Sequence, residues 1–277
     1  IPTRSDGSGG ANADGLSDSS VMVVCVPDPT LGTRAEVGCC RWWRERRVGA
    51  VGPIRTAGRG TVDGVVDLEK QKLRSRFEAR LLDASAESNH ETQGARKTAE
   101  IGSMSGTVVE LGPGTGVNMR YYARGVRVIA IEPNPVMHDR LRRHADEHEV
   151  DMEIRTLQGE SIDVADGEAD GVVGTLLLCG VEDPAMVINE AHRVLKPGGR
   201  YFFTEHVRAP ESTWMHRTQR VLRRPHGWMF NGCRTDQDTG SLLRGSAFET
   251  VEILEEDRGP RGLYVRYGII GTAVKAS

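Results

Sequence analysis

The chain has 277 residues, five cysteines and a formal net charge of −3. This length suits one large α/β domain with an extension, or two small domains, and the charge provides no global basic field to gather nucleic acid or anionic membrane. The longest apolar stretch, residues 172–181, falls far short of the roughly 20 residues that a membrane helix needs. We therefore expect neither a nucleic-acid partner nor a membrane span, and the sequence leaves the oligomeric state open.

The first 63 residues are rich in Gly, Ser, Asp, Arg and Pro and contain only brief apolar runs. Such a composition buries too little apolar surface to offset the entropy of ordering the chain. We expect residues 1–63 to form a disordered or weakly ordered extension, and residues 64–277 to form a single domain. The N-terminal residues do not follow the basic-then-apolar pattern of a secretory signal, which favours a cytoplasmic location.

The cysteines are odd in number and include no C-x-x-C pair, a pattern typical neither of a disulfide framework nor of a structural zinc site. It indicates a reducing compartment and predicts no bound metal. The cysteines are Cys25, Cys39, Cys40, Cys179 and Cys233.

The domain begins with an amphipathic pattern over residues 65–82, which predicts a helix, and a polar stretch over residues 83–105, which predicts a connection. The core then occupies residues 106–277, where β-branched apolar runs alternate with helical segments. The expected strands are 107–111, 126–132, 152–156, 171–177, 200–205, 251–257 and 264–274. The expected helices between them are 118–124, 135–147, 184–195, 213–223 and 237–245.

Strands that alternate with helices indicate a parallel sheet with helices on its faces. The last two expected strands are joined only by residues 258–262, and so short a link suits an antiparallel hairpin rather than a parallel crossover. The predicted fold is therefore α/β, a Rossmann-like, seven-stranded mixed sheet with its last strand antiparallel and helices on both faces.

The first strand of the core runs into a glycine-rich turn with the sequence E-L-G-P-G-T-G, residues 110–116. Glycines let the backbone approach a ligand closely, and the first turn of a doubly wound sheet lies where ligands bind. Glu132 ends the next strand about twenty residues later, where a carboxylate can accept both ribose hydroxyls of a nucleoside.

The main competing motif is the dinucleotide fingerprint G-x-G-x-x-G, whose third glycine is replaced here by Val117. The acid Glu110 stands directly before the turn and would repel a pyrophosphate. A cationic sulfonium amino acid would be attracted to the same place.

The motifs E-L-G-P-G-T-G, I-E-P-N-P, Q-G-E-S and L-K-P-G-G occur in the order found in class I methyltransferases, and residues 107–275 resemble that family. The resemblance implies that S-adenosylmethionine is the cofactor. It implies that Glu132 binds ribose, that the glycine turn holds the methionine part, that the residues after the third strand flank adenine, and that the end of the fourth strand lines the site. Pro113 departs from the pattern because it has no amide hydrogen to donate. The cofactor-binding residues implied in this way are Glu110, Gly112, Gly114, Thr115, Gly116, Asn118, Glu132, Pro133, Asn134, Gly159, Glu160, Ser161, Thr175, Leu176 and Leu177.

Further runs, among them T-L-L-L-C, E-H-V, S-T-W and N-G-C, are most similar to the branch that contains the alkyl thiol S-methyltransferases. This similarity implies a small-molecule acceptor, a thiol sulfur. The quinone-biosynthesis methyltransferases share only the more general motifs. The animal members of the branch carry an N-terminal hydrophobic anchor that we do not find in this sequence.

A thiol with a pKa near 8.5 is already partly ionised at neutral pH, so alignment of the reactants matters more than a strong base. His206 follows the fifth strand and is the best candidate for a catalytic base, with His216 and His226 as weaker candidates. We interpret Cys179 and Cys233 as buried small apolar residues. A group of large apolar residues after the fifth strand suggests an acceptor pocket or helix packing: Trp214, Met215, Trp228, Met229 and Phe230.

Three other functions stay open on this evidence. The same fold can methylate oxygen, carbon or nitrogen of a small metabolite, it can bind the cofactor without catalysis, or the turn can belong to a nicotinamide oxidoreductase.

Overall fold

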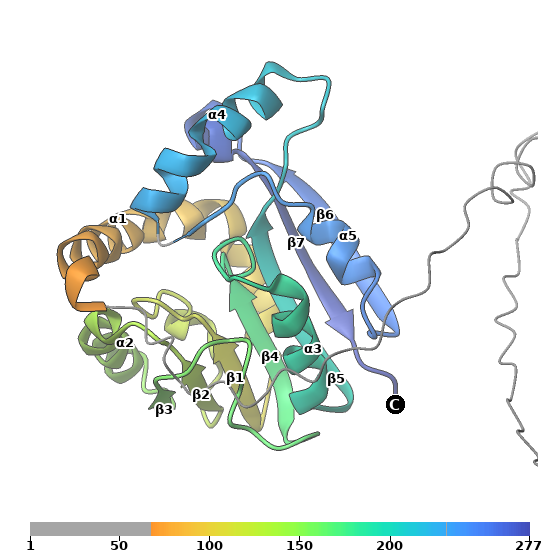
Figure 1. Cartoon of the computed structure of the whole chain (residues 1–277). Coiled ribbons are helices and arrows are strands. Elements are labelled where there is room, and N and C mark those ends of the chain that lie inside the picture. Colours follow the sequence, from red (N-terminus) through yellow and green to blue (C-terminus); the bar gives the residue numbers. More distant parts are fainter. Residues whose placement is uncertain (1–67, 231) are drawn as a thin grey trace, which may run out of the picture. The chain divides into compact units, whose positions relative to one another are not determined.

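The computed structural model of the chain describes residues 68–230 and 232–277, which lie within one compact unit that runs from Val62 to Ser277 (Figure 1). The expected extension over residues 1–63 lies outside the described residues and stays a prediction. In chain order the elements are α1 (Leu68–Ile101), β1 (Thr107–Leu111), the 3-10 helix η1 (Met119–Tyr121), β2 (Arg127–Ile131), α2 (Pro135–Glu147), β3 (Asp151–Arg155), β4 (Ala169–Thr175), α3 (Pro184–Val194), β5 (Leu195–His206), α4 (Trp214–Met229), α5 (Thr239–Arg244), β6 (Thr250–Asp257), the 3-10 helix η2 (Pro260–Val265) and β7 (Tyr267–Val274).

The strands form one seven-stranded sheet in the order β3-β2-β1-β4-β5-β7-β6. The first five strands are parallel, and β7 runs antiparallel to both of its neighbours. The hairpin between β6 and β7 was expected from the shortness of their link, and the sheet confirms the predicted fold class. The order in which strands are added to the sheet reverses at β1: β2 and β3 lie on one side of it, and β4 and β5 lie on the other. The carboxyl ends of β1 and β4 therefore lie at the topological switch point, where a ligand can bind.

Alternate residues of β1 face two separate apolar cores. Val109 and Leu111 pack in a cluster with residues of α3 and α5, including Val187 and Leu243. Val108 packs on the other face of the sheet with residues of α1, η1 and α2. Helices therefore cover both faces of the sheet, as expected, and Figure 1 shows the same arrangement.

The predicted connection over residues 83–105 is wrong for most of its length, because α1 continues without a break to Ile101. The segment has no proline, and three of its buried residues, Gln93, Lys97 and Ile101, recur every fourth position. Two of these three are polar, so a search for apolar periodicity misses the buried face of this helix.

Two other predicted helices have different bounds. The stretch 118–124 contains only the short η1, because Tyr122 is already extended, with φ −70° and ψ 136°. Helix α4 continues past the predicted end at residue 223 to Met229, with Pro225 inside it. Val221, whose carbonyl Pro225 leaves without a helical partner, is 76% exposed, so water can reach this part of the helix.

Three strands also differ from their predicted bounds by two residues or more. Strand β4 spans Ala169–Thr175 rather than 171–177, so Leu176 and Leu177 follow the strand instead of ending it. Strand β5 starts at Leu195, which pairs with Ala169 before a shift in register. Strand β7 starts at Tyr267 rather than residue 264, because η2 occupies residues up to Val265. None of the helices that the structure describes combines the length and apolar character needed to cross a membrane.

Candidate active site

Three glycines between β1 and η1 adopt backbone conformations that other residues rarely take. The φ angle is +62° at Gly112, +58° at Gly114 and +90° at Gly116. A Cβ atom at Gly112 would lie 2.8 Å from Cδ1 of Leu177, which follows β4. The turn therefore requires glycine for its dihedral angles, and at Gly112 also for the close approach of the neighbouring chain.

Glu110, the residue before the end of β1, is completely buried. Its Oε1 accepts a hydrogen bond from Asn118 Nδ2 (2.8 Å) and its Oε2 accepts one from the Tyr122 hydroxyl (2.9 Å). Lys97 of α1 donates to Asn118 Oδ1 (3.0 Å). Burial raises the pKa of Glu110, although these hydrogen bonds and Lys97 oppose the shift. In this arrangement Glu110 holds Asn118 and Tyr122, and its contact with a ligand stays a prediction.

Glu132 follows β2 and links the glycine turn to the start of α2. Its carboxylate accepts hydrogen bonds from the backbone N–H groups of Gly114 (2.9 Å) and Asn134 (2.8 Å). Burial raises the pKa of Glu132, and the two backbone hydrogen bonds act in the opposite direction. A carboxylate has about four lone-pair sites, so two sites can still accept hydroxyl groups.

Asn118 connects the ends of β1 and β4. Besides its bond to Glu110, its Nδ2 lies 3.0 Å from Thr175 Oγ1, to which it donates. Thr115, within the glycine turn, is 1% exposed, and its hydroxyl oxygen has no hydrogen-bond partner among the described residues. The predicted site thus contains a buried polar atom that a ligand can satisfy.

The residues expected beside adenine lie after β3. Gly159 is buried, Glu160 is half-buried and Ser161 is exposed. Glu160 accepts a hydrogen bond from the backbone of Glu182, in the chain before α3 (3.1 Å). These three residues therefore border an edge that stays open to solvent.

The start of α2 carries the last two predicted cofactor residues. Asn134 caps this helix by accepting a hydrogen bond from the backbone of Val136 (3.1 Å), and Pro133 is exposed. The side chain of Asn134 therefore has a structural role in addition to any contact with a ligand.

A turn after β4 is held by the buried carboxylate of Glu205. Glu205 Oε1 accepts from the backbone N–H groups of Leu177 (2.9 Å) and Leu178 (2.8 Å), and Oε2 accepts from Cys179 (3.2 Å). Burial raises the pKa of Glu205 to about 8, while the three backbone bonds lower it. Leu176, in the same turn, has a φ angle of +55°, a strained conformation for leucine.

His206, the predicted base, ends β5 and is half-buried. Its Nε2 lies 3.3 Å from Nη1 of Arg258, and its Nδ1 lies 3.9 Å from Sγ of Cys233. Both ring nitrogens therefore face protein groups. A guanidinium group only donates, so Nε2 is the acceptor in this contact and Nδ1 carries the proton.

The predicted acceptor pocket is assembled only in part. Met215 is buried, but Trp214 is 72% exposed and Trp228 is 70% exposed. Both tryptophans lie on α4, which turns them toward solvent, so neither the expected pocket nor helix packing explains them. His216 and His226, the weaker base candidates, also lie on α4.

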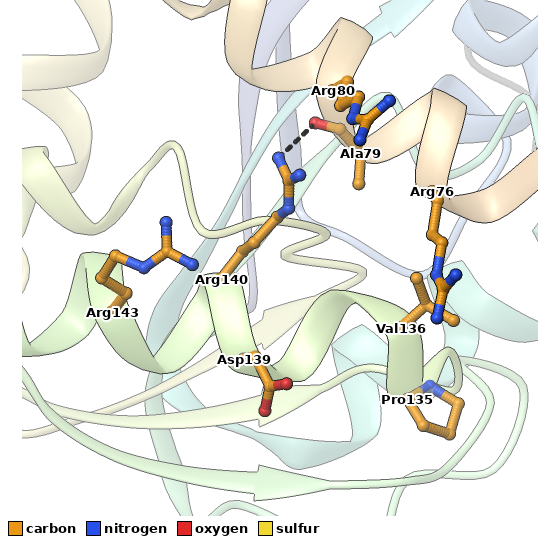
Figure 2. A pocket seen from close by; sticks show the side chains of 8 residues that line it. All are labelled: Arg76, Ala79, Arg80, Pro135, Val136, Asp139, Arg140 and Arg143. Carbon is orange, nitrogen blue, oxygen red and sulfur yellow. Dashed lines mark hydrogen bonds between the residues drawn. The ribbon is translucent and has the colours of Figure 1, made fainter. Parts of the chain in front are cut away.

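Two cavities lie outside the predicted site. One, of about 440 Å³, opens between α1 and the start of α2, and four arginines surround it (Figure 2): Arg76, Arg80, Arg140 and Arg143. Figure 2 shows Arg140 turned toward α1, where it donates to the carbonyl oxygen of Ala79 (3.4 Å). The other cavity, of about 560 Å³, lies beside the end of β5 and the β6–β7 hairpin, and includes Val207 and Glu256.

The sequence did not point to several residues that build the site. Lys97 lies in a stretch that carries no apolar pattern, and Tyr122 has no motif of its own beyond its position after the glycine turn. Cys179 and Cys233 lie 54 positions apart in the sequence, yet their sulfur atoms are 3.3 Å apart. Glu205 belongs to the run E-H-V, but that run did not indicate its hydrogen bonds to the turn after β4.

The chain is similar in sequence to known methyltransferases. The family described as "Methyltransferase domain" matches residues 109–203. The human thiol S-methyltransferase TMT1A is 36% identical over 172 residues, which cover 61% of this chain and 70% of that protein. The mouse thiol S-methyltransferase TMT1B is 32% identical over 209 residues, which cover 70% of this chain and 83% of that protein.

A solved structure shares the fold at low sequence identity. The geranyl diphosphate C-methyltransferase of Streptomyces coelicolor A3(2), solved with S-adenosyl-L-homocysteine, superposes with a TM-score of 0.54. It is 16% identical, and the match covers 67% of this chain and 76% of that chain.

Proposed function

The chain belongs to the S-adenosylmethionine-dependent methyltransferase family that includes the thiol S-methyltransferases TMT1A and TMT1B, and from that premise we propose that it methylates the sulfur of a small thiol. The observation that carries this proposal is the 36% identity to TMT1A over 70% of that protein. The mouse relative, of which the chain covers 83%, carries the same name.

The described residues fit the cofactor. The buried Thr115 hydroxyl has no partner in the described part of the chain, and the Glu132 carboxylate accepts only two backbone hydrogen bonds, which leaves oxygen lone pairs for hydroxyl groups. We assign the ribose to Glu132, the methionine part to the turn and Asn118, and the adenine edge to residues 159–161. When bound, S-adenosylmethionine supplies an electrophilic methyl group whose leaving sulfur needs no proton.

The chain's own contribution is to place an acceptor in line with that methyl group and to keep water away. Alignment of this kind can lower the barrier by about 7–11 kcal/mol. A base contributes less for a thiol than for an alcohol, because a thiol is partly ionised near neutral pH.

The surroundings of His206 favour a thiol acceptor. Its two ring nitrogens already face Arg258 and Cys233, so neither is open to take a proton from an acceptor without a rearrangement. An acceptor with a high pKa, such as an alcohol, would depend on such a base, whereas a thiol would not.

Matched acceptor pairs test the proposal. The full chain is incubated with methyl-labelled S-adenosylmethionine and with an alkanethiol or the alkanol of the same carbon number, and separately with thiophenol or phenol. We expect label in the thioether products and none in the ethers. Methylation of phenol but of neither thiol would remove the thiol assignment and favour an O-methyltransferase.

A second candidate is a domain that binds the cofactor without catalysis. It predicts binding of S-adenosylhomocysteine in calorimetry together with no label on any acceptor. Turnover with a single acceptor of any class would exclude it.

A further inference from the structure

Two cysteines that the sequence separates widely meet beside the end of β5. Cys179 lies in the turn after β4, and Cys233 lies in the segment after α4. Their Sγ atoms are 3.3 Å apart, and both thiols are free. Cys179 is 1% exposed, whereas Cys233 is 8% exposed, so Cys233 is the one that a small molecule reaches first.

The Cys233 sulfur has two hydrogen-bonding neighbours, the Cys179 thiol and the His206 ring. His206 Nδ1 lies 3.9 Å from its sulfur, and Arg258, which donates to the opposite nitrogen of that ring, keeps a proton on Nδ1.

These surroundings distinguish the two thiols. Hydrogen bonds with Cys179 and His206 lower the pKa of Cys233, and they outweigh its burial. The pKa of Cys179 is raised, because of its hydrogen bond with Cys233 and because it is buried. A thiolate is the reactive form of cysteine, so the more exposed sulfur is also the more nucleophilic one.

The backbone already holds the two cysteines together. The N–H group of Arg234 donates to the carbonyl oxygen of Cys179 (2.6 Å), so the residue after Cys233 is hydrogen-bonded to Cys179 itself. The sulfur atoms need to approach by little more than 1 Å to reach the length of a disulfide, about 2.05 Å. Closing the bond therefore requires a local movement and no rearrangement of the sheet.

We propose that Cys179 and Cys233 form a redox-active dithiol, which a small-molecule disulfide oxidises reversibly to an intramolecular disulfide. Cys233 is the attacking thiolate and Cys179 is the resolving thiol. His206 acts as a positioning residue that donates to the thiolate. Thiols are the acceptor class proposed above, but this dithiol chemistry holds whether or not the chain methylates them.

The reaction has two exchange steps. The Cys233 thiolate attacks one sulfur of the small disulfide RSSR, the S–S bond breaks, and one thiolate RS⁻ leaves. Cys179 passes its proton to that leaving thiolate and attacks the Cys233 sulfur of the mixed disulfide, expelling the second RS⁻, which takes a proton from water. The cysteine pair loses two electrons, and RSSR gains them to give two thiols.

The test uses the full chain with the three remaining cysteines replaced, Cys25→Ser, Cys39→Ser and Cys40→Ser. The protein is equilibrated in buffers of 2-hydroxyethyl disulfide and 2-mercaptoethanol at a series of ratios, quenched with acid and alkylated. Mass spectrometry of the peptides then reports the bond. We expect a cross-link between Cys179 and Cys233 that increases with the disulfide ratio and disappears with excess thiol.

Single variants separate the two roles. Cys179→Ser should accumulate a mixed disulfide on Cys233, because no resolving thiol is left, whereas Cys233→Ser should leave Cys179 unmodified. His206→Gln should shift the pH midpoint for alkylation of Cys233 upward, which a purely structural role would not do. Circular dichroism checks that each variant is folded, and Cys233→Ala repeats the test if the serine variant is not.

Two results would overturn the proposal. One is a folded protein that forms no cross-link at any ratio, or that forms its mixed disulfide on Cys179. The other is about one zinc ion per chain in the purified protein, lost in Cys233→Ser. The ligand atoms of Cys179, His206 and Cys233 all lie within 4.8 Å of one another, and a bound metal would occupy both sulfurs.

Discussion

The candidate active site has two sides, which are assembled in different ways. The cofactor side comprises the glycine turn, Glu110 and Glu132, and the acceptor side comprises His206 and its neighbours. On the cofactor side, the hydrogen bonds of Glu110 and Glu132 join residues no more than 18 positions apart in the sequence. On the acceptor side, the contacts around His206 join residues 27 and 52 positions apart. A short ordered motif can therefore report Glu110 and Glu132, whereas the contacts of His206, like the bond from Asn118 to Thr175, 57 positions away, exist only once the sheet has formed.

Of the variants that test the difference between the two sides, Glu132→Ala on the cofactor side should have the largest effect, a loss of affinity for S-adenosylhomocysteine. Hydrogen bonds to a charged group contribute about 1.5–3 kcal/mol each. Loss of two such bonds to ribose should weaken S-adenosylhomocysteine binding at least about 100-fold. Isothermal titration calorimetry measures the change. Asp139→Ala is the matched control, because the Asp139 side chain lies on α2 and is 93% exposed. Equal affinity in both variants would remove the ribose assignment.

Lys97 contributes to the cofactor side from outside its motifs, because it lies on α1 and donates a hydrogen bond to Asn118. Burial lowers the pKa of Lys97 to about 8 from 10.5. Between these pH values the unfolded chain binds the proton that the folded chain has released, so the free energy of unfolding should rise with pH across that window. The rise from this group should approach about 3 kcal/mol.

Urea denaturation at a series of pH values measures this rise, and Lys97→Met should lack it. A variant with the same pH profile as the natural chain between pH 8 and 10.5 would show that Lys97 does not titrate there.

A pair of glycine variants can distinguish the cost of a steric clash at an added Cβ from the cost of a positive φ angle. Gly112 and Gly125 both have positive φ angles, but a Cβ at Gly125 would meet nothing within 4 Å. Gly125→Ala should lower the free energy of unfolding by about 1–2 kcal/mol through its left-handed conformation alone. Gly112→Ala should lower it by about 1 kcal/mol more, because Leu177 must move.

Only Gly112→Ala should weaken cofactor binding. Denaturation and calorimetry on the two variants measure both quantities. Loss of cofactor binding in Gly125→Ala as well would show that backbone strain at residue 125 reaches the glycine turn. Binding could then not be assigned to the close contact at Gly112 alone.

The smallest effect is expected on the acceptor side, for His206→Gln. A general base contributes about 10²–10⁴-fold when it takes a proton in the transition state. Because both nitrogens of His206 are already engaged and a thiol ionises readily, we expect kcat for a thiol to fall about 10-fold or less. The loss should shrink as the pH approaches the pKa of the thiol.

Steady-state rates from pH 6.5 to 9, with cofactor affinity measured in parallel, test this prediction. A loss of more than about 100-fold in kcat at unchanged affinity would restore His206 as the base. An equal loss of cofactor affinity would instead show that His206 also affects cofactor binding, so that the cofactor side and the acceptor side are coupled.

The sheet and most element bounds were predictable, because apolar periodicity and short links determine them locally. The hairpin of β6 and β7 and the helix α2 are examples. The second half of α1 was not predictable in this way, since the face that it buries includes Gln93 and Lys97. The meeting of Cys179 and Cys233 depends on where α4 returns to the sheet, and no local pattern encodes that position.

Glu205 has a consequence for redesign of the enzyme. Its carboxylate holds the turn after β4, which carries residues predicted to line the cofactor, and the next residue in the chain is His206, on the acceptor side. A graft that exchanges the end of β5 together with the segment after it for those of another methyltransferase, in order to change the acceptor, would also disturb the turn unless an acid is kept at this position. The boundary of such a graft should therefore lie after His206, with the whole of β5 retained.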